Sequence, residues 1–428
     1  MNNPTTYTSK VETSSPLGGL TIYSLRTGVD NVVAFCGSLL GGGLFASDNI
    51  LVPEMTASLL DLGTKQRDKF EIASALESVG AKLGFSSGRH RVHFSGKCLK
   101  KDIPLVIQLL AEQLIFPAFE EQDLNSTIQR RKAELKQLKE DTRTRAVEAF
   151  LLRLYPEKHP NRPKSLSDQQ KATNTISVNQ LKKFHSDHYG LGSLNICFVG
   201  DVDHENFENH TANHFGQWQN SSASIKESTL KAKRLGKGVE TSEHIPDKTS
   251  ADLVTGHGIG IDKEHQDYYP VMMSHFILGG NFSARLMATV RDREGLTYGV
   301  QSTTGGVDQG NDGYWYIWGT FGPKDLEKAK ESINKQLDLW YKEGVTAEEL
   351  NSKKSTITGM YQVGLDTTSG LARRILTTVE RGKELSFMDE YPKIITAITL
   401  DQVNKSIQTY CDPGKRITVV AGTVDESN

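Results

Sequence analysis

The sequence lacks any apolar run close to the ~18 residues needed to cross a bilayer. It also lacks an excess of charge of one sign, because 50 Lys and Arg are balanced by 52 Asp and Glu. No block of basic residues of the kind that binds a phosphate backbone is present in the sequence. We therefore expect neither a membrane span nor nucleic acid binding.

Cysteine is scarce, with four residues that are widely spaced and never form Cys-x-x-Cys. Cys36 and Cys197 lie in apolar, β-branched runs that are typical of buried strands, where cysteine behaves as a small hydrophobe. This spacing indicates neither a structural zinc site nor a disulfide framework.

The first residues show neither a basic n-region nor an apolar h-region. On this basis we expect a cytoplasmic protein, or a periplasmic one if a leader has been removed.

What is present is an internal repeat. Residues 175–203 and 397–425 align without a gap, and each predicts a helix that starts at Ser or Thr, a Gly or Pro-Gly turn, and a β-branched strand that ends in Gly and Asp. With 428 residues and roughly 100 to 200 residues per domain, duplication is the simplest interpretation. We expect a first domain at 1–220, a Ser-, Lys- and Gly-rich linker at 221–238, and a second domain at 239–428.

Within each half, strand patterns are mixed with long helical ones. Residues 20–28 and 31–40 predict a hairpin with its turn near 28–30, and residues 81–88 predict an edge strand. No regular βαβ rhythm follows. The fold class predicted is α+β, with two homologous α/β sandwich halves, each a mainly antiparallel sheet with helices on one face.

Several motifs carry a family resemblance. They are a Gly-Thr pair at 63–64 with a helix that ends at ESVGAKL, HFGQW at 214–218, ARLMATVRDREGLTYGV at 284–300, TAEELNSKKSTITGMYQ at 346–362 and VVAGTVD at 419–425. With these motifs in this order, the chain resembles the M16 (pitrilysin-like) metallopeptidases, the inverzincins. The resemblance is in particular to their short bacterial members that work as paired subunits.

The resemblance implies a zinc motif, His-x-x-Glu-His, upstream of the Gly-Thr pair. Residues four apart share a helix face, so both imidazoles can bind one zinc while the Glu activates water. Here that place holds Glu54, Ala57 and Ser58 at the ligand, base and ligand positions. The family's third ligand, a Glu, falls near Gln137, or at Glu134 with a small shift in alignment. We expect no zinc on this chain.

The second half keeps another element of the family's site. The resemblance implies that Arg291 and Tyr298, seven residues apart, lie across the cavity from the zinc, bind substrate carbonyls and help to stabilise the tetrahedral intermediate. Gly295 is expected to end the helix that carries Arg291, and Tyr298 to open the next strand. Taken alone, such a pair would be interpreted as a surface arginine and an ordinary strand aromatic, because this spacing is common by chance.

Three histidine pairs raise the alternative of a relocated metal site: His90 with His93, His185 with His188, and His210 with His214. Strand geometry separates the first pair, and helix-surface packing is the more common role for the other two. The glycine-rich stretches at 38–49 and 275–286 lack a following Gly-Lys-Ser/Thr, so we expect loops that line a peptide cavity and no phosphate site.

These patterns favour a non-catalytic subunit of a heterodimeric zinc peptidase that is inactive alone. A paralogue with His-x-x-Glu-His would hold the zinc, and this chain would supply Arg291 and Tyr298 for the hydrolysis of peptides. The alternative is a pseudoenzyme that acts as a structural or assembly subunit, or as a peptide-binding module. Autonomous hydrolysis through an unrecognised site is a third possibility.

Overall fold

The computed structural model describes residues 7–219, 223–225, 230–233, 236–308 and 310–424. It divides into two compact units, each built from three chain segments. The first unit comprises residues 1–133, 167–226 and 360–392, and the second comprises residues 134–166, 227–359 and 393–428. The linker expected at 221–238 lies partly outside the described residues. Among the helices that are described, none combines the length and apolarity of a membrane span.

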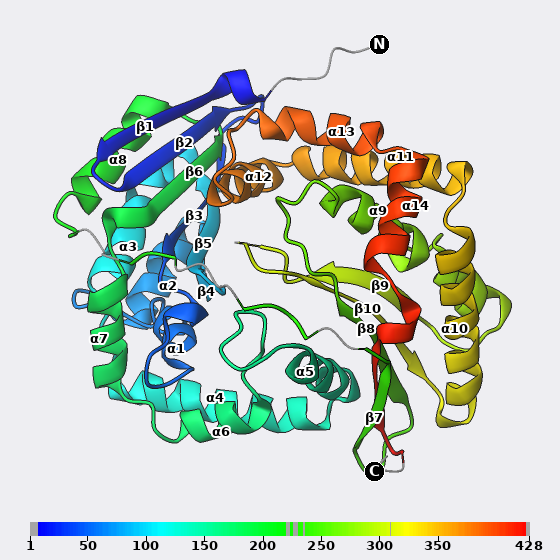
Figure 1. The fold of residues 1–428 in the computed structure, drawn as a ribbon. Helices are drawn as coiled ribbons and strands as arrows, with labels where there is room; N and C mark the ends of the chain where they lie inside the picture. The colour runs from blue at the N-terminus through cyan, green and yellow to red at the C-terminus, as the bar shows by residue number, and fades with distance from the viewer. Residues whose placement is uncertain (1–6, 220–222, 226–229, 234–235, 309, 425–428) are drawn as a thin grey trace. The chain divides into compact units, whose positions relative to one another are not determined.

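The first unit contains a six-stranded sheet with the order β1-β2-β6-β3-β5-β4 (Figure 1). Its strands are β1 (Val11–Leu17), β2 (Leu20–Arg26), β3 (Val32–Leu40), β4 (Lys82–Ser87), β5 (Arg91–Leu99) and β6 (Leu194–Gly200). β2 and β6 run parallel, and the other neighbouring pairs run antiparallel. β4 lies at one edge, as predicted for residues 81–88.

The second unit contains a five-stranded sheet with the order β7-β11-β8-β10-β9. Its strands are β7 (Val239–His244), β8 (Ala251–Gly258), β9 (Val300–Gly305), β10 (Tyr314–Phe321) and β11 (Ile417–Gly422). β7 and β11 run parallel, and the remaining pairs run antiparallel. The order and directions match those of β2-β6-β3-β5-β4 in the first sheet, as expected for duplicated halves.

The helices that precede β6 and β11 are built alike. α7 (Val178–His188) begins with a capping box between Ser177 and Gln180, and α14 (Leu400–Tyr410) begins with one between Thr399 and Gln402. In each case the hydroxyl accepts from the backbone N–H three residues on, while the glutamine side chain reaches back. The repeat seen in the sequence is therefore one helix–turn–strand unit used twice.

The predicted hairpin between residues 20–28 and 31–40 is wrong. β6 lies between β2 and β3 and pairs with both. The strand LNICFVG is apolar on both faces and almost fully buried, so it is suited to a central position. The turn residues between β2 and β3 show only that the two strands are neighbours in sequence. The strand that separates them in the sheet, β6, lies more than 150 residues further along the chain.

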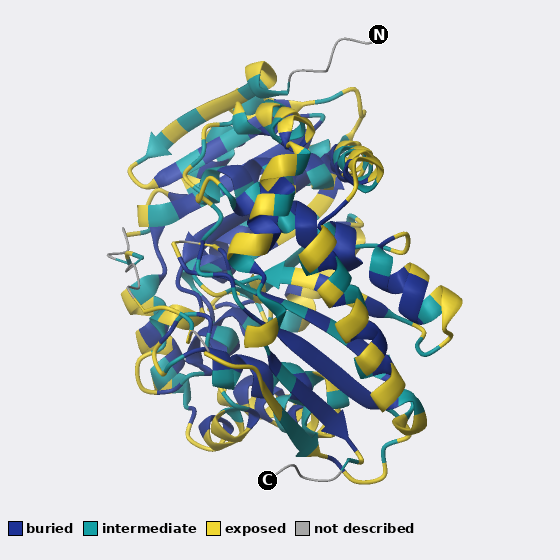
Figure 2. Ribbon diagram, turned by 45° about the vertical axis from the view of Figure 1, so that its right-hand side comes forward, coloured by how far each residue is buried: buried dark blue, intermediate teal, exposed yellow. Residues whose placement is uncertain are grey.

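Helices cover both sheets. Besides α7 and α14, the α-helices are α1 (Val52–Ser58), α2 (Lys69–Ser78), α3 (Ile103–Ile115), α4 (Glu121–Glu140), α5 (Thr142–Leu154), α6 (Leu166–Thr173), α8 (His204–Phe215), α9 (Tyr268–Gly279), α10 (Leu326–Glu343), α11 (Ala347–Leu365), α12 (Thr368–Glu380) and α13 (Phe387–Ala397). The described residues also include a π-helix, η5 (Met287–Arg293). In Figure 2 the central strands are largely buried, whereas edge strands and helices also show exposed residues. The α+β prediction is confirmed.

One helix of each sequence half packs on the sheet of the other half. α12 packs on β3 and β6, and α5 packs on β8 and β11. Leu371, Ile375 and Leu376 of α12 join Cys36 and Cys197 in one buried cluster. Helical spacing identifies the apolar face of such a helix but not the sheet that it covers, so the exchange was not predicted.

The last residue of α12 is anchored to the first sheet by a buried polar cluster. The Glu380 carboxylate accepts hydrogen bonds from the Ser38 hydroxyl and, at 3.1 Å, from His93 Nε2, and it lies 3.5 Å from Arg91 Nε. Burial acts to raise the pKa of Glu380, but His93, Ser38 and Arg91 outweigh it, and the pKa lies below its ordinary value.

We expect Glu380→Gln to destabilise the protein at neutral pH by roughly 2 kcal/mol, because the hydrogen bonds from Ser38 and His93 would go to a neutral acceptor and Arg91 would lose its ionic partner. A carboxyl with a lowered folded-state pKa stabilises fully above its unfolded pKa, and the contribution disappears as pH falls through the folded pKa. The difference between wild type and variant should therefore shrink in acid. Urea unfolding at pH 7 and near pH 4 measures it, with exposed Glu77→Gln as control. A difference that is independent of pH would contradict the assignment.

Candidate functional site

The residues that the resemblance aligns with the zinc motif lie in helix α1, which has Pro53 in its first turn. The Glu54 carboxylate lies 3.5 Å from Nη2 of Arg131 in α4, and the same guanidinium nitrogen donates to Gln169 Oε1 at 2.6 Å. Ala57 is buried, and the Ser58 hydroxyl donates to the carbonyl of Glu54.

This donor set does not fit zinc. A zinc site needs three or four lone-pair donors, usually His, Cys, Asp or Glu, whereas here one carboxylate faces a guanidinium cation. Gln137 and Glu134 have exposed side chains in the part of α4 that belongs to the second unit. Across the described ranges, no group of three or more His, Cys, Asp or Glu is placed to hold a metal ion.

Arg291 lies in the last turn of η5. Gly295 adopts φ 65°, and its N–H donates to the Arg291 carbonyl at 3.0 Å, so it ends this helix as predicted. The guanidinium lies 3.6 Å from Asp292 Oδ1 and 5.5 Å from the centre of the Phe282 ring. Since π-helical turns often occur at functional sites, this geometry agrees with a specialised role for Arg291.

Tyr298 lies in the turn that precedes β9, with 98% of its surface exposed. It does not open the strand as predicted, because β9 begins at Val300. The hydroxyl of Thr297 explains the turn, since it accepts from the Gly299 N–H at 3.1 Å and donates to the Thr320 carbonyl. Among the described residues, the Tyr298 hydroxyl has no hydrogen-bond partner, and Tyr298 makes no hydrogen bond or cation–π contact with Arg291.

Three of the six histidines in these pairs make contacts within the protein. His185 Nε2 donates to the Leu114 carbonyl at 2.7 Å, and burial lowers the pKa of this imidazole. His188 packs against Phe45 and Phe184. His93 is committed to Glu380.

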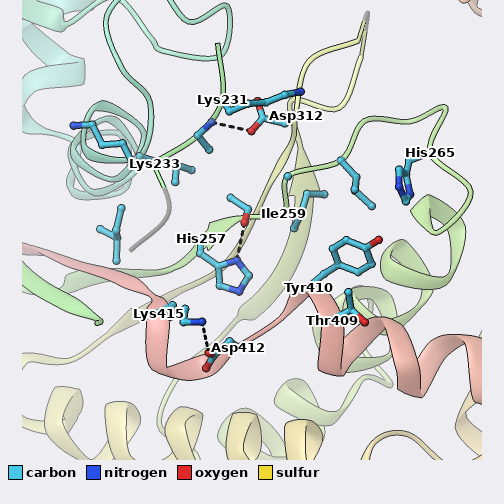
Figure 3. Close-up of a pocket in the computed structure, with 16 residues that line it drawn as sticks. Lys231, Lys233, His257, Ile259, His265, Asp312, Thr409, Tyr410, Asp412 and Lys415 are labelled. Carbon is cyan, nitrogen blue, oxygen red and sulfur yellow. Dashed lines mark hydrogen bonds and ion pairs between the residues drawn. The ribbon is translucent and has the colours of Figure 1, made fainter. Parts of the chain in front are cut away.

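The second unit also contains a cavity of about 690 Å³ near the C-terminal end of α14 (Figure 3). Three of its charged groups interact within the protein: Lys415 pairs with Asp412 at 3.1 Å, and Asp312 accepts from the Ala232 N–H. Burial lowers the pKa of His257 to about 4, so this ring is neutral at pH 7 and donates from Nδ1 to the Gly258 carbonyl.

Beside this cavity lies a buried polar cluster that sequence patterns did not indicate. His159 Nε2 donates to Asp312 Oδ1 at 2.9 Å, while His159 Nδ1 accepts from the backbone N–H of Asn161. Tyr155 stacks on the His159 ring, with 4.1 Å between ring centres. The cluster joins the segment after α5 to the loop before β10 and to Ala232.

Comparison with known proteins agrees with this architecture. Residues 56–162 match the model of insulinase (peptidase family M16), and residues 175–357 match the model of the peptidase M16 inactive domain. An uncharacterized zinc protease of Streptomyces coelicolor is 22% identical over 351 residues, which are 81% of this chain and 75% of that protein. The uncharacterized zinc protease YmxG of Bacillus subtilis is 22% identical over 345 residues, 80% of this chain and 81% of that protein.

Solved structures show the same fold over nearly the whole chain. A peptidase M16 inactive domain from Pseudomonas fluorescens aligns with a TM-score of 0.84 at 21% identity, covering 98% of this chain and 99% of that one. A protease from Helicobacter pylori aligns with a TM-score of 0.86 at 17% identity, covering 96% and 99%.

The duplicated α+β sandwich has the fold of the peptidase M16 proteins that it matches. The chain belongs to the peptidase M16 family.

Proposed function

We propose that this chain is the non-catalytic subunit of a heterodimeric zinc peptidase. The zinc would lie on an M16 paralogue with an intact His-x-x-Glu-His, and this chain would supply Arg291 and Tyr298 for the hydrolysis of peptides. The observation that carries the proposal is the contrast between the two sites. Glu54 faces an internal cation, whereas Tyr298 exposes 98% of its surface beside the helix end that carries Arg291.

Arg291 would bind the carbonyl oxygen next to the scissile bond and then the negative charge that develops on it. A guanidinium keeps its charge through any working pH, and its planar donors hold a fixed direction. The Gly295 bond to the Arg291 carbonyl holds the backbone from which this side chain extends. Preorganised donors of this kind lower the barrier because they need no reorganisation when charge appears.

Tyr298 would donate its phenolic hydrogen to the same oxyanion or to a neighbouring substrate carbonyl. Among the described residues it makes no internal hydrogen bond, so its donor is available to a ligand. When bound on the partner, zinc would polarise the scissile carbonyl and activate water. The residues of this chain would orient the peptide and stabilise charge.

A purely structural subunit remains the alternative function. The Arg131–Glu54 ion pair favours it, because it replaces a metal-binding arrangement by an internal contact between α4 and α1. Under this alternative the chain would associate with a partner without contacting the substrate.

Metal analysis and hydrolysis assays test the proposal together. We expect the isolated chain to contain no stoichiometric zinc and to leave an unstructured peptide intact. The complex with a His-x-x-Glu-His paralogue from the same genome should contain about one zinc per pair. Hydrolysis by the complex should stop after chelation and return with added zinc. Stoichiometric zinc on the isolated chain, or hydrolysis by it, would refute the proposal.

A further inference from the structure

Residues 281–283 form a short loop between α9 and the segment that leads into η5. A buried lysine of α11, Lys353, holds both ends of this loop. Its ammonium donates to Asn281 Oδ1 at 3.0 Å, to the Ser283 carbonyl at 2.9 Å and to the Ser283 hydroxyl at 2.6 Å. All three donors of the ammonium are used on the two residues that flank Phe282.

Burying a lysine is costly, and only 3% of Lys353 is exposed. Burial lowers the pKa of Lys353, and the nearest opposing influence is the charge of Glu349, which forms a bidentate pair with Arg285. The three hydrogen bonds of the Lys353 ammonium compensate for the lost hydration and restrict the conformation of the loop. Such an arrangement is expected where the position of a loop matters.

The loop also lies close to the edge strand β9. A Cβ on Gly279, the last residue of α9, would lie 2.5 Å from the backbone nitrogen of Ser302 in β9. Only glycine allows this approach between the end of α9 and the strand. The Phe282 loop therefore starts beside the strand that follows Tyr298.

Phe282 is presented to solvent by this loop. It exposes 73% of its surface, and its ring centre lies 5.5 Å from the Arg291 guanidinium. A cation over the ring face restricts the arginine and leaves much of the ring uncovered. A large aromatic side chain held outward by a buried lysine indicates a contact with a ligand more than a packing role.

We propose that Phe282 is a specificity-determining residue that contacts an apolar side chain of the peptide next to the carbonyl bound by Arg291, and that Lys353 is its positioning residue. The inference rests on the proposed function and names its substrate class: extended peptides with a large apolar residue beside the scissile bond. Phe282 would contribute to selectivity through binding, whereas Arg291 would contribute through charge stabilisation.

The test uses the complex with the paralogue and two fluorescein-labelled peptides that differ only in Leu or Ser beside the cleaved bond. Wild type should prefer the Leu peptide by about 10-fold in kcat/KM, a usual value for one apolar contact. Phe282→Ala should reduce this preference towards unity through KM, and Lys353→Met should act in the same direction. Arg291→Ala should lower kcat for both peptides and keep their ratio.

Matched controls separate this role from general effects. Phe70→Ala removes an equally exposed phenylalanine, 72% exposed, from the first unit, and Lys354→Met removes the neighbouring lysine. Both should keep the preference. Equal loss for the two peptides in Phe282→Ala, or an unchanged ratio, would overturn the inference.

If the assembled complex does not hydrolyse peptides, the proposed function is refuted. The role of Phe282 can still be tested, because binding of the two peptides to the complex can be measured. Fluorescence anisotropy then gives the ratio of dissociation constants for the two peptides with the complex. A Leu preference that Phe282→Ala and Lys353→Met abolish would support the contact, and equal binding of both peptides by wild type would overturn it.

Discussion

Arg291→Ala is expected to lower kcat of the assembled pair by about 10² to 10³-fold, the usual effect of removing one donor from an oxyanion site. KM should change much less, because the guanidinium interacts most strongly with charge that develops only in the transition state. The fold should be unaffected, since Arg291 is partly exposed and its ionic neighbour, Asp292, is exposed. Steady-state hydrolysis of an unstructured peptide by the mixed subunits gives both constants.

The neighbouring Arg293 provides the control, because its side chain is exposed in the same helix. Arg293→Ala should retain wild-type rates, and Arg291→Lys should restore part of the loss, since lysine keeps the charge without the planar donors. Size-exclusion chromatography must show that each variant still assembles. If an assembled pair with Arg291→Ala keeps the wild-type kcat, Arg291 does not take part in catalysis, and the chain would act as a structural subunit.

Asp312→Ala is expected to destabilise the protein by about 2–6 kcal/mol, because two buried donors lose their acceptor at a cost of about 1–3 kcal/mol each. Asp312 is 1% exposed and accepts from His159 Nε2 and from the Ala232 N–H. Without the carboxylate, both donors would be buried without an acceptor. Urea unfolding followed by tryptophan fluorescence measures the change.

Asp308→Ala is the matched control from the same loop. Asp308 pairs with Lys263 at 2.9 Å, but its side chain is 60% exposed, so its removal should cost no more than about 1 kcal/mol. Equal effects of the two substitutions would show that the His159–Asp312 cluster is not a structural anchor.

Local patterns in the sequence were sufficient to predict several features. The helix–strand repeat, the edge strand at 81–88 and the helix end at Gly295 each depend on residues a few positions apart. Capping residues, alternation and the left-handed glycine act at that range, so they can be recognised without the fold.

Contacts between distant segments could not be predicted in this way. The place of β6 between β2 and β3, and the exchange of α5 and α12, depend on which apolar surfaces meet. The same holds for the site, where Arg131 faces Glu54 across 77 positions and Lys353 holds a loop 70 positions away. A single Arg or Lys produces no periodic pattern in the sequence. Only its contacts in the folded protein show that it is paired with a particular internal group.

The most direct measurement of the central claim is the rate of peptide hydrolysis at a fixed, limiting amount of the His-x-x-Glu-His paralogue as this chain is added. A shared active site predicts almost no rate without this chain, a rise on addition, and a plateau at one chain per partner. A paralogue that is fully active by itself, with a rate that stays flat as this chain is added, would contradict the account.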